Sequence, residues 1–109
     1  MKSQVVLLES AEQDLKDLKS YIVKQFGRKA WLVSYRGIKD TVRALQSFPL
    51  AGSIPEEISD FNLTQFRQVL SGRNQIIYET RQGTIFVHII CDTRKDLRAL
   101  LIRRSKRAP

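Results

Sequence analysis

The sequence contains little of what many functional classes require. Its 109 residues include one cysteine, Cys91, and one histidine, His88. A lone cysteine forms no internal disulfide, so we expect a reducing compartment, the cytoplasm. One histidine and one cysteine are too few for a metal site of the usual spacing. The chain has no glycine-rich phosphate loop and no Ser-His-Asp arrangement, and nothing in it indicates a cofactor or a small-molecule substrate.

Long apolar runs are also absent. None approaches the roughly 20 residues that a membrane-spanning helix needs. The run Val5–Leu8 is too short for the apolar region of a signal peptide. There is no internal repeat, and the length suits one compact domain, residues 1–109, with one modest core. We therefore expect no membrane association and no second domain.

Acidic residues are scarce relative to basic ones. Nineteen Lys and Arg face eleven Asp and Glu, which gives a formal net charge of +8 and a pI of about 10.1. A domain this basic attracts polyanions, either nucleic acid or a strongly acidic protein surface. A net charge of this size also occurs where it serves solubility alone. The charge by itself therefore leaves the partner open.

The first part of the chain predicts a strand and a helix. Gln4–Glu9 is short and rich in Val and Leu, as is typical of a strand. A helix is expected from Ser10, which forms a capping-box pattern with Gln13. Apolar residues then recur at helical spacing as far as Phe26. Gly27 stands where a C-cap glycine belongs and predicts the end of this helix.

A second amphipathic helix is predicted over Arg28–Ser47. Gly37 within it indicates close packing against the neighbouring helix. The short connection makes the two helices an antiparallel hairpin. Phe48-Pro49 ends the second helix, because a residue before proline is pushed out of the helical region. Four aromatic residues are assigned to the apolar stripes of the core: Phe26, Trp31, Tyr35 and Phe48.

The second half of the chain predicts a meander of three strands, Phe66–Leu70, Gln75–Glu79 and Ile85–Cys91. Before them, Pro49, Gly52 and Pro55 mark an irregular crossing loop, and the pattern of Glu56–Asn62 is ambiguous between loop and a short turn. After them, Asp92-Thr93 is expected to cap a short last helix. The element order β-α-α-β-β-β-α predicts an α+β fold with an N-terminal strand, a helical hairpin packed on a mostly antiparallel sheet, and a short C-terminal helix.

Basic side chains gather towards the C-terminus, where arginine forks can grip phosphate or carboxylate at two points. We expect the sheet and the last helix to present one positive, target-binding surface. Its candidate residues are Arg67, Arg73, Arg94, Lys95, Arg98, Arg103 and Arg104. The alternative is a solvated face that ends in a frayed tail from Arg103 onward. Deleting such a tail would affect stability little.

His88 is the one side chain with an ordinary pKa suited to acid–base chemistry at neutral pH, about 6.5. Side chains alternate along a strand, so His88 and Cys91, three residues apart, are expected on opposite faces of the sheet. A cysteine nucleophile would need a nearby histidine, and this spacing does not offer one. The other interpretation of His88 is a structural or surface histidine.

Several short motifs, in order along nearly the whole chain, resemble the RelE/ParE superfamily of toxins. The helical part carries Ala11-Glu12-Gln13-Asp14-Leu15, Tyr21-Ile22 and Phe26-Gly27, and the loop carries Pro49 and Gly52 as P-x-x-G. The sheet carries Phe66-Arg67, Gly72, Ile76-Ile77-Tyr78, Val87-His88-Ile89-Ile90 and the D-x-R-x-D element Asp92–Asp96. The motifs are specific as a set rather than singly.

The resemblance implies the toxin of a type II toxin–antitoxin pair, neutralised by a cognate antitoxin that wraps a segment around it. A basic toxin suits an acidic antitoxin segment that folds on binding. The resemblance also implies one of two targets. ParE-like members bind DNA gyrase without chemistry of their own, whereas RelE-like members are ribosome-dependent mRNA endonucleases.

The motifs favour the ParE-like branch. The long hairpin signature is more typical of it, and the position that is usually arginine before Ile-Ile-Tyr is Gln75 here. Leu100 stands where some nucleases of the superfamily carry tyrosine. If the chain is a nuclease, the catalytic candidates are Arg94, Arg73 and His88. A third hypothesis, a plain nucleic-acid-binding module, ranks last because the aromatic residues are assigned to the core.

Overall fold

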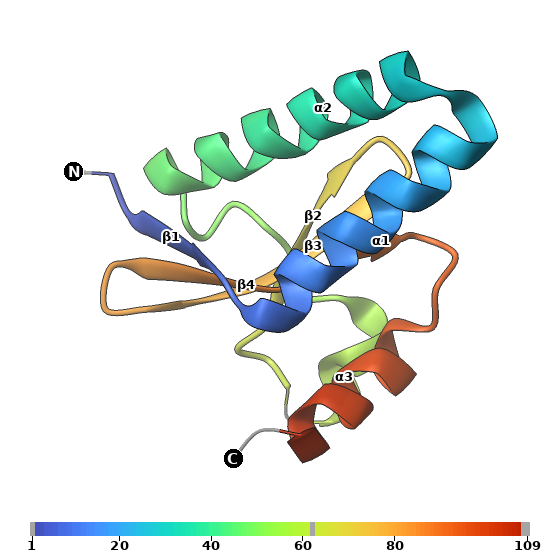
Figure 1. Ribbon diagram of the computed structural model, residues 1–109. Helices are drawn as coiled ribbons and strands as arrows, with labels where there is room; N and C mark the ends of the chain where they lie inside the picture. The colour runs from blue at the N-terminus through green and yellow to red at the C-terminus, as the bar shows by residue number, and fades with distance from the viewer. Residues whose placement is uncertain (1, 62, 108–109) are drawn as a thin grey trace.

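The computed structural model describes residues 2–61 and 63–107, and its elements follow the predicted order (Figure 1). These elements are β1 (Gln4–Leu7), α1 (Glu9–Phe26), α2 (Arg28–Ser47), the 3-10 helix η1 (Glu56–Phe61), β2 (Arg67–Ser71), β3 (Asn74–Arg81), β4 (Thr84–Asp92) and α3 (Leu97–Arg107). The α+β class is confirmed. Within the ambiguous segment Glu56–Asn62, the residues of η1 form a 3-10 helix, and Asn62 lies outside the described residues.

The four strands form one mixed sheet in the order β1-β4-β3-β2. β2, β3 and β4 are an antiparallel meander, as predicted. β1 runs parallel to β4, and their pairing ends at Leu7 and Val87. Because β4 continues to Asp92, the second half of its outer edge has no neighbouring strand. This open edge positions the candidate site.

Helices cover both faces of the sheet (Figure 1). The hairpin of α1 and α2 packs on one face, around the buried residues Ala11, Ile38, Leu45, Ile76, Tyr78, Ile85, Val87 and Ile90. On the other face lies a second core, shared with η1 and α3, of Ile58, Phe66, Ile77, Ile89, Leu97 and Leu101. A fully buried aliphatic side chain contributes about 1.5–3 kcal/mol. The near-continuous apolar run of β4 follows from this burial on both sides.

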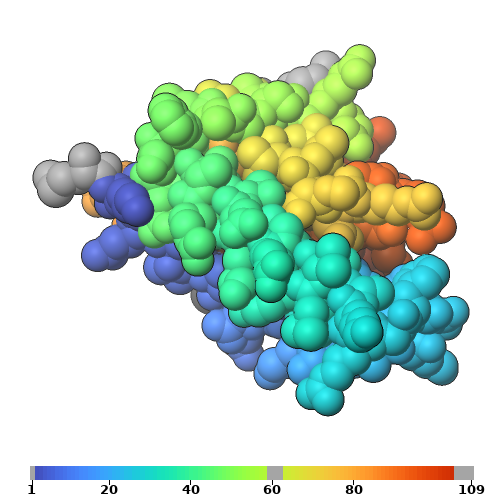
Figure 2. All heavy atoms as spheres, turned by 90° about the horizontal axis from the view of Figure 1, so that it is seen from above, coloured from blue at the N-terminus to red at the C-terminus, as the bar shows by residue number. Residues whose placement is uncertain are grey.

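Viewed from above, α2 crosses the middle of the surface (Figure 2). α1 lies on one side of it, and the loop after α2 and the turn between β2 and β3 lie on the other. The side chains on this outer surface of α2 are exposed, including Leu32, Arg36, Lys39 and Arg43. None of the helices in the described part of the chain is long and apolar enough to span a bilayer.

The start of the first helix differs from the prediction. α1 begins at Glu9, its N-cap is Leu8, and no side chain caps it. The hydroxyl of Ser10 donates instead to the carbonyl oxygen of His88, at 3.3 Å, and Gln13 donates to Asp17. The predicted capping box is therefore wrong, because an unpaired carbonyl of β4 engages the Ser10 hydroxyl.

The cap of the last helix also differs. α3 begins at Leu97, and Asp96 Oδ1 accepts a hydrogen bond from the backbone N–H of Ala99 at 3.0 Å. Asp96 therefore caps the helix in place of the predicted Asp92-Thr93. Asp92 belongs to the end of β4, and its carboxylate is held by a neighbouring arginine.

Two of the four aromatic residues assigned to the core lie outside it. Trp31 is 7% exposed, but Phe26 and Phe48 are each 69% exposed, since they stand at or just beyond helix ends. Gly37 allows close packing, although not between helices. A Cβ atom at this position would lie 2.9 Å from Ser71 Oγ at the end of β2.

Candidate functional site

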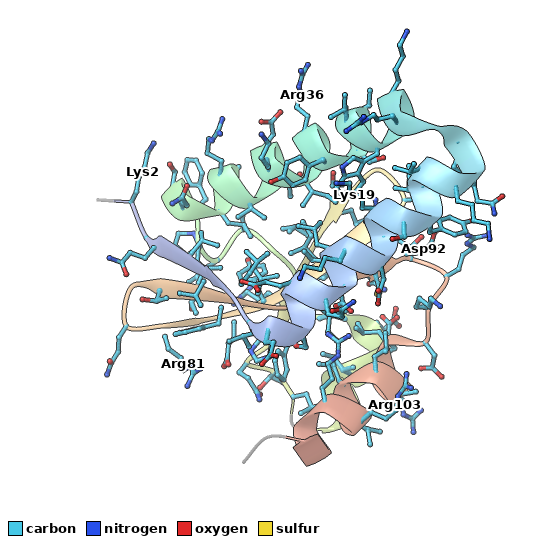
Figure 3. The ribbon with its side chains drawn as sticks, in the orientation of Figure 1. Lys2, Lys19, Arg36, Arg81, Asp92 and Arg103 are labelled. Carbon is cyan, nitrogen blue, oxygen red and sulfur yellow. The ribbon has the colours of Figure 1, made fainter. Side chains whose placement is uncertain are left out.

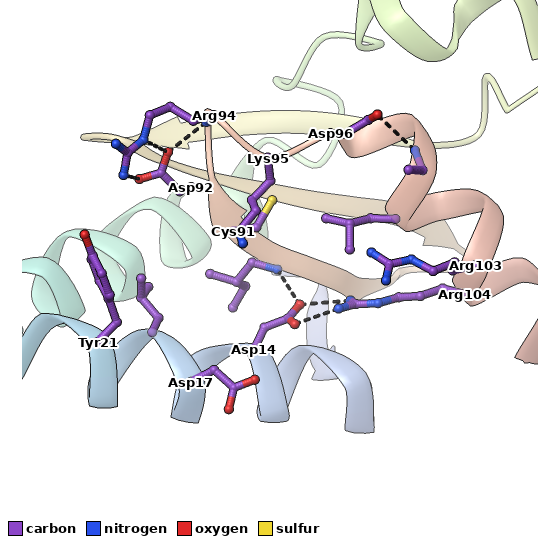
Figure 4. Close-up of a pocket in the computed structure, with 14 residues that line it drawn as sticks. Asp14, Asp17, Tyr21, Cys91, Asp92, Arg94, Lys95, Asp96, Arg103 and Arg104 are labelled. Atoms are coloured by element: carbon purple, nitrogen blue, oxygen red, sulfur yellow. Dashed lines mark hydrogen bonds and ion pairs between the residues drawn. The ribbon is translucent and has the colours of Figure 1, made fainter.

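A pocket of about 610 Å³ opens between α1, the end of β4 and α3 (Figure 4). Apolar side chains, Leu18, Ile90, Ala99 and Leu100, form part of its wall. The charged residues that line it are the acidic Asp14, Asp17, Asp92 and Asp96 and the basic Arg94, Lys95, Arg103 and Arg104. Four of the seven predicted target-binding residues therefore share one pocket.

The pocket exists because β1 is short. The last backbone hydrogen bond from the β1 side joins Leu8 N to Val87 O at 3.1 Å, and the chain then turns into α1. The next polar groups on this edge of β4 bond to side chains instead of a strand. Ser10 and Arg104 donate to the carbonyl of His88, and the N–H of Ile90 donates to Asp14 Oδ2 at 3.0 Å. Side chains thus satisfy the open edge, as buried backbone requires.

Asp14 and Arg104 form a bidentate ion pair that joins α1 to α3 (Figure 4). The two oxygen–nitrogen distances are 2.6 and 2.9 Å, and Arg104 Nη1 also lies 2.7 Å from the His88 carbonyl oxygen. Their side chains are 14% and 21% exposed. Arg104 therefore holds the last helix against the first. At Arg104 this contradicts the alternative of a solvated face that ends in a frayed tail.

The sequence did contain a signal for this pair. Asp14 stands three residues after Ala11 and four before Leu18, and both of these lie on the apolar face of the helix. A carboxylate that borders a buried face at this spacing calls for a cationic partner. The partner itself, 90 residues away, has no signal in the local sequence.

A β-bulge reverses the predicted orientation of His88 and Cys91. Ile77 pairs with Ile89 and the adjacent Tyr78 pairs with Val87, which leaves His88 without an opposed residue. The His88 ring meets the Phe66 ring edge-on at 4.9 Å, within the core on the α3 face, and Cys91 packs against that same core. The expectation of opposite faces is wrong, because an extra residue in one strand shifts the alternation.

His88 does not line the pocket. Its Nε2 atom lies 2.8 Å from Glu79 Oε1, and Arg81 approaches the same carboxylate oxygen at 3.4 Å. Cys91 does line the pocket, but burial raises the pKa of its thiol, which bonds Gln75 at 3.5 Å. A protonated thiol is a poor nucleophile.

Arg94 grips Asp92 at the pocket rim. Its Nε and Nη2 atoms lie 3.0 and 3.2 Å from the two carboxylate oxygens, and its backbone N–H donates at 2.7 Å. The side-chain hydrogen bonds from Arg94 contribute most to lowering the pKa of Asp92, and the backbone hydrogen bond also lowers it. The positive charge of Arg73 lowers this pKa further. The Arg94 side chain is itself 73% exposed, so its cation faces outward and is accessible to a partner.

Replacing Arg94 with alanine is expected to raise the pKa of Asp92 towards its ordinary value of about 3.8. The wild-type interaction stabilises the fold above that value and is lost as pH falls through the lowered pKa. An NMR titration of the Asp92 carboxyl carbon would measure the shift, with Lys95→Ala as the control. An unchanged midpoint in Arg94→Ala would contradict the assigned contact.

The other predicted target-binding residues lie elsewhere. Arg73 is in the turn between β2 and β3, and its carbonyl accepts from Thr93 N at 2.8 Å, which places it beside the pocket rim. Arg98 is exposed on α3 but is not a lining residue. Arg67 Nη1 donates to the carbonyl of Gly52 at 2.7 Å, on the far side of β2. Of the nuclease candidates, Arg94 alone lines the pocket.

The signature residues of the crossing loop meet at one buried hydroxyl. Gly52 N donates to Tyr78 Oη at 2.9 Å, and that hydroxyl donates to the carbonyl of Pro49 at 2.8 Å. Burial raises the pKa of Tyr78, and its hydroxyl remains a donor. Together with the Arg67–Gly52 bond, these contacts fix the loop to the sheet. The P-x-x-G, F-R and I-I-Y motifs thus have a shared structural role.

Comparison with known proteins identifies relatives of this arrangement. A family described as the ParE toxin of the type II toxin–antitoxin system parDE matches residues 5–96. A chain from the chromosomal ParDE system of P. aeruginosa shares the fold with a TM-score of 0.69 at 17% identity, over 84% of this chain and 96% of that one. A chain of the toxin–antitoxin complex RelBE2 from Mycobacterium tuberculosis gives a TM-score of 0.60 at 15% identity, covering 84% and 99%. No curated protein sequence matches the chain significantly.

Proposed function

This chain belongs to the ParE toxin family of type II toxin–antitoxin systems, and on that premise we propose that it arrests growth by binding DNA gyrase in the cytoplasm, without catalysis of its own. The observation that carries the proposal is the family match, which spans residues 5–96 and so covers both the hairpin and the sheet. The partner that neutralises it is a cognate antitoxin. Two of the similar folds come from a ParDE system and a RelBE2 toxin–antitoxin complex.

The chemistry of the pocket supports a binding role. Cleaving RNA needs a base to deprotonate the 2′-hydroxyl and an acid to protonate the leaving oxygen. His88 is engaged with Glu79 away from the pocket, and the raised pKa of Cys91 keeps its thiol protonated. Gln75, which replaces the usual arginine, is 3% exposed and bonded to Cys91. Exposed cations on a mixed apolar and charged wall suit a protein target.

A ribosome-dependent mRNA endonuclease is the second candidate. Arg94, Lys95 and Arg103 lie around one pocket, and Arg73 is close enough to Asp92 for its charge to lower that carboxyl pKa. Such a cluster could hold a scissile phosphate and stabilise its developing charge. In this alternative the pocket would bind RNA rather than a gyrase surface.

Two assays on the purified chain separate these candidates. In the first, gyrase supercoils plasmid DNA; in the second, ribosomes programmed with mRNA are monitored for cleavage. We expect supercoiling to be inhibited and the mRNA to remain intact. Arg94→Ala should weaken inhibition no more than about tenfold, because contacts spread over several cations share the binding energy.

The opposite outcome is equally specific. Cleavage of the mRNA without any effect on supercoiling would establish the nuclease candidate, provided that Arg94→Ala abolishes the cleavage. Circular dichroism of each variant is the control, since a misfolded variant fails both assays. Lys24→Ala, an exposed change on α1 outside the pocket, is the matched surface variant and should behave as the wild type.

A further inference from the structure

The outward face of α2 carries a row of cations that the proposed target contacts do not use. Lys29, Arg36 and Arg43 are exposed and stand seven residues apart. Seven residues make nearly two helical turns, so these side chains lie on one line along the helix, with about 10.5 Å between neighbours. We call these three residues the α2 stripe. None of them was among the target-binding candidates from the sequence.

The α2 stripe faces away from the rest of the molecule. Arg36 points outward from α2, on the side opposite the sheet (Figure 3). The buried residues of the helix, Trp31, Ile38 and Leu45, repeat at the same spacing of seven on the opposite face. The stripe is therefore held outward by the packing of the helix on the core.

The charges of α2 are not placed to stabilise the helix. Five basic residues and one acidic residue give α2 a net charge of +4. Arg28 and Lys29 stand in its first turn, where the helix dipole favours acidic side chains, and its last turn has no basic residue. The single acid, Asp40, approaches Arg43 at 3.9 Å in an exposed pair. Helix stability therefore does not explain these cations, whereas a bound polyanion would.

Two members of the stripe are free to bind. Lys29 and Arg36 form no ion pair with a residue in the described ranges 2–61 and 63–107. Lys2 extends the row beyond the end of the helix (Figure 3). It is exposed, and the adjacent Ser3 N donates to the carbonyl of Gln46 in the last turn of α2 at 2.9 Å. The chain thus presents four cations along one side of the molecule.

The surroundings of the stripe suit phosphate better than a protein surface. Exposed large apolar side chains, Leu32 and Val33, are confined to the first two turns of α2, and residues 36–47 have none. A protein interface usually has an apolar centre, whereas phosphate contacts need only cations and hydrogen-bond donors. The 20 residues of α2 span about 30 Å, close to the roughly 34 Å of one turn of B-form DNA.

We propose that the α2 stripe binds the phosphate backbone of duplex DNA. Lys29, Arg36 and Arg43 each contact a phosphate, and Lys2 contacts another at the end of the row. Such contacts do not depend on base sequence. The inference rests on the proposed function, because gyrase holds duplex DNA and brings it to a toxin bound on the enzyme. The pocket between α1, β4 and α3 shares no residue with the stripe, so it remains available for gyrase.

Fluorescence anisotropy of a labelled 24-base-pair duplex tests the inference on the purified full chain, without gyrase. We expect saturable binding that does not depend on base sequence, with log K falling by about 0.9 per log unit of salt for each phosphate contacted. Lys29→Gln, Arg36→Gln and Arg43→Gln together should weaken binding about tenfold or more and reduce this salt slope by roughly 2–3.

A second triple variant with the same net charge is the control. Lys16→Gln, Lys19→Gln and Lys24→Gln together remove three exposed cations from α1. This change should weaken binding no more than about threefold, because only long-range attraction is lost. Circular dichroism checks the fold of both variants. If the stripe variant does not fold, Arg36→Gln alone should weaken binding about threefold and reduce the salt slope by about 0.9.

Equal losses in both triple variants would overturn the inference, because binding would then follow net charge alone. Displacement of the duplex by polyglutamate at a lower concentration of charge would also overturn it and indicate an acidic protein partner. Tighter binding of duplex RNA than of duplex DNA would reject DNA as the ligand.

The gyrase assay keeps this test separate from the proposed function. Duplex binding that depends on the stripe, without gyrase inhibition, would reject the gyrase target and leave the DNA assignment standing. Gyrase inhibition without duplex binding would reject the DNA assignment alone.

Discussion

Truncating Arg104 to alanine is expected to lower the free energy of unfolding by about 2–3 kcal/mol. The change removes both bonds to Asp14 and one of the donors to the His88 carbonyl, and it leaves a carboxylate that is 14% exposed without its cation. Asp14→Ala should have a similar effect, since it also removes the acceptor of Ile90 N–H. Urea unfolding followed by circular dichroism would measure both.

The neighbouring arginine supplies the control. Arg103 is exposed, so Arg103→Ala should change stability by no more than about 0.5 kcal/mol. Equal, small effects at both positions would show that the Asp14–Arg104 pair behaves as an ordinary surface ion pair. The Asp14–Arg104 pair also changes the result expected for a truncation before Arg103. Removing this segment should reduce stability as well as target binding, because it takes away Arg104.

The second large effect is expected at Gly52. A Cβ atom there would lie 2.6 Å from the Gln68 carbonyl oxygen and 2.7 Å from the Tyr78 hydroxyl. Neither atom can move cheaply, since one is backbone and the other bonds both Gly52 N and Pro49 O. Gly52→Ala should therefore cost about 3 kcal/mol, at the upper end of the usual range for overpacking. Thermal unfolding would measure it.

Gly37→Ala is the matched control, because it adds the same methyl group elsewhere. The nearest atom there is Ser71 Oγ at 2.9 Å, which belongs to a short side chain that can rotate. Alanine also gains about 1 kcal/mol of helix propensity within α2, which opposes the crowding. We expect a net change below about 1 kcal/mol. If Gly37→Ala were as unstable as Gly52→Ala, the contact distances of the added Cβ atoms would not explain the loss of stability at either site.

The Gly52 contacts also explain why the motifs of the loop and the sheet occur together. Pro49, Gly52 and Tyr78 are joined by one hydroxyl, and Arg67 bonds the same loop. These contacts hold the loop against the sheet, so residues that are far apart in the sequence share one structural role.

Local sequence determined most of the secondary structure. α2 was predicted with its observed bounds, Arg28–Ser47, and Gly27 was predicted as the C-cap of α1, where its φ of 93° is observed. The three meander strands were predicted to within a few residues. These features depend on the spacing of apolar residues and on backbone preferences, which act over a few positions and can be read directly.

Tertiary structure decided how the site is assembled. β1 pairs with β4 and stops at Leu7, so two polar groups of β4 had to find partners, and residues 10, 14 and 104 supply them. The bulge at His88 then placed its ring and Cys91 on one face. The positions of these side chains depend on which backbone groups remain unpaired once the strands have formed the sheet. A local pattern of residues does not contain that information, because the partners are up to 90 positions apart.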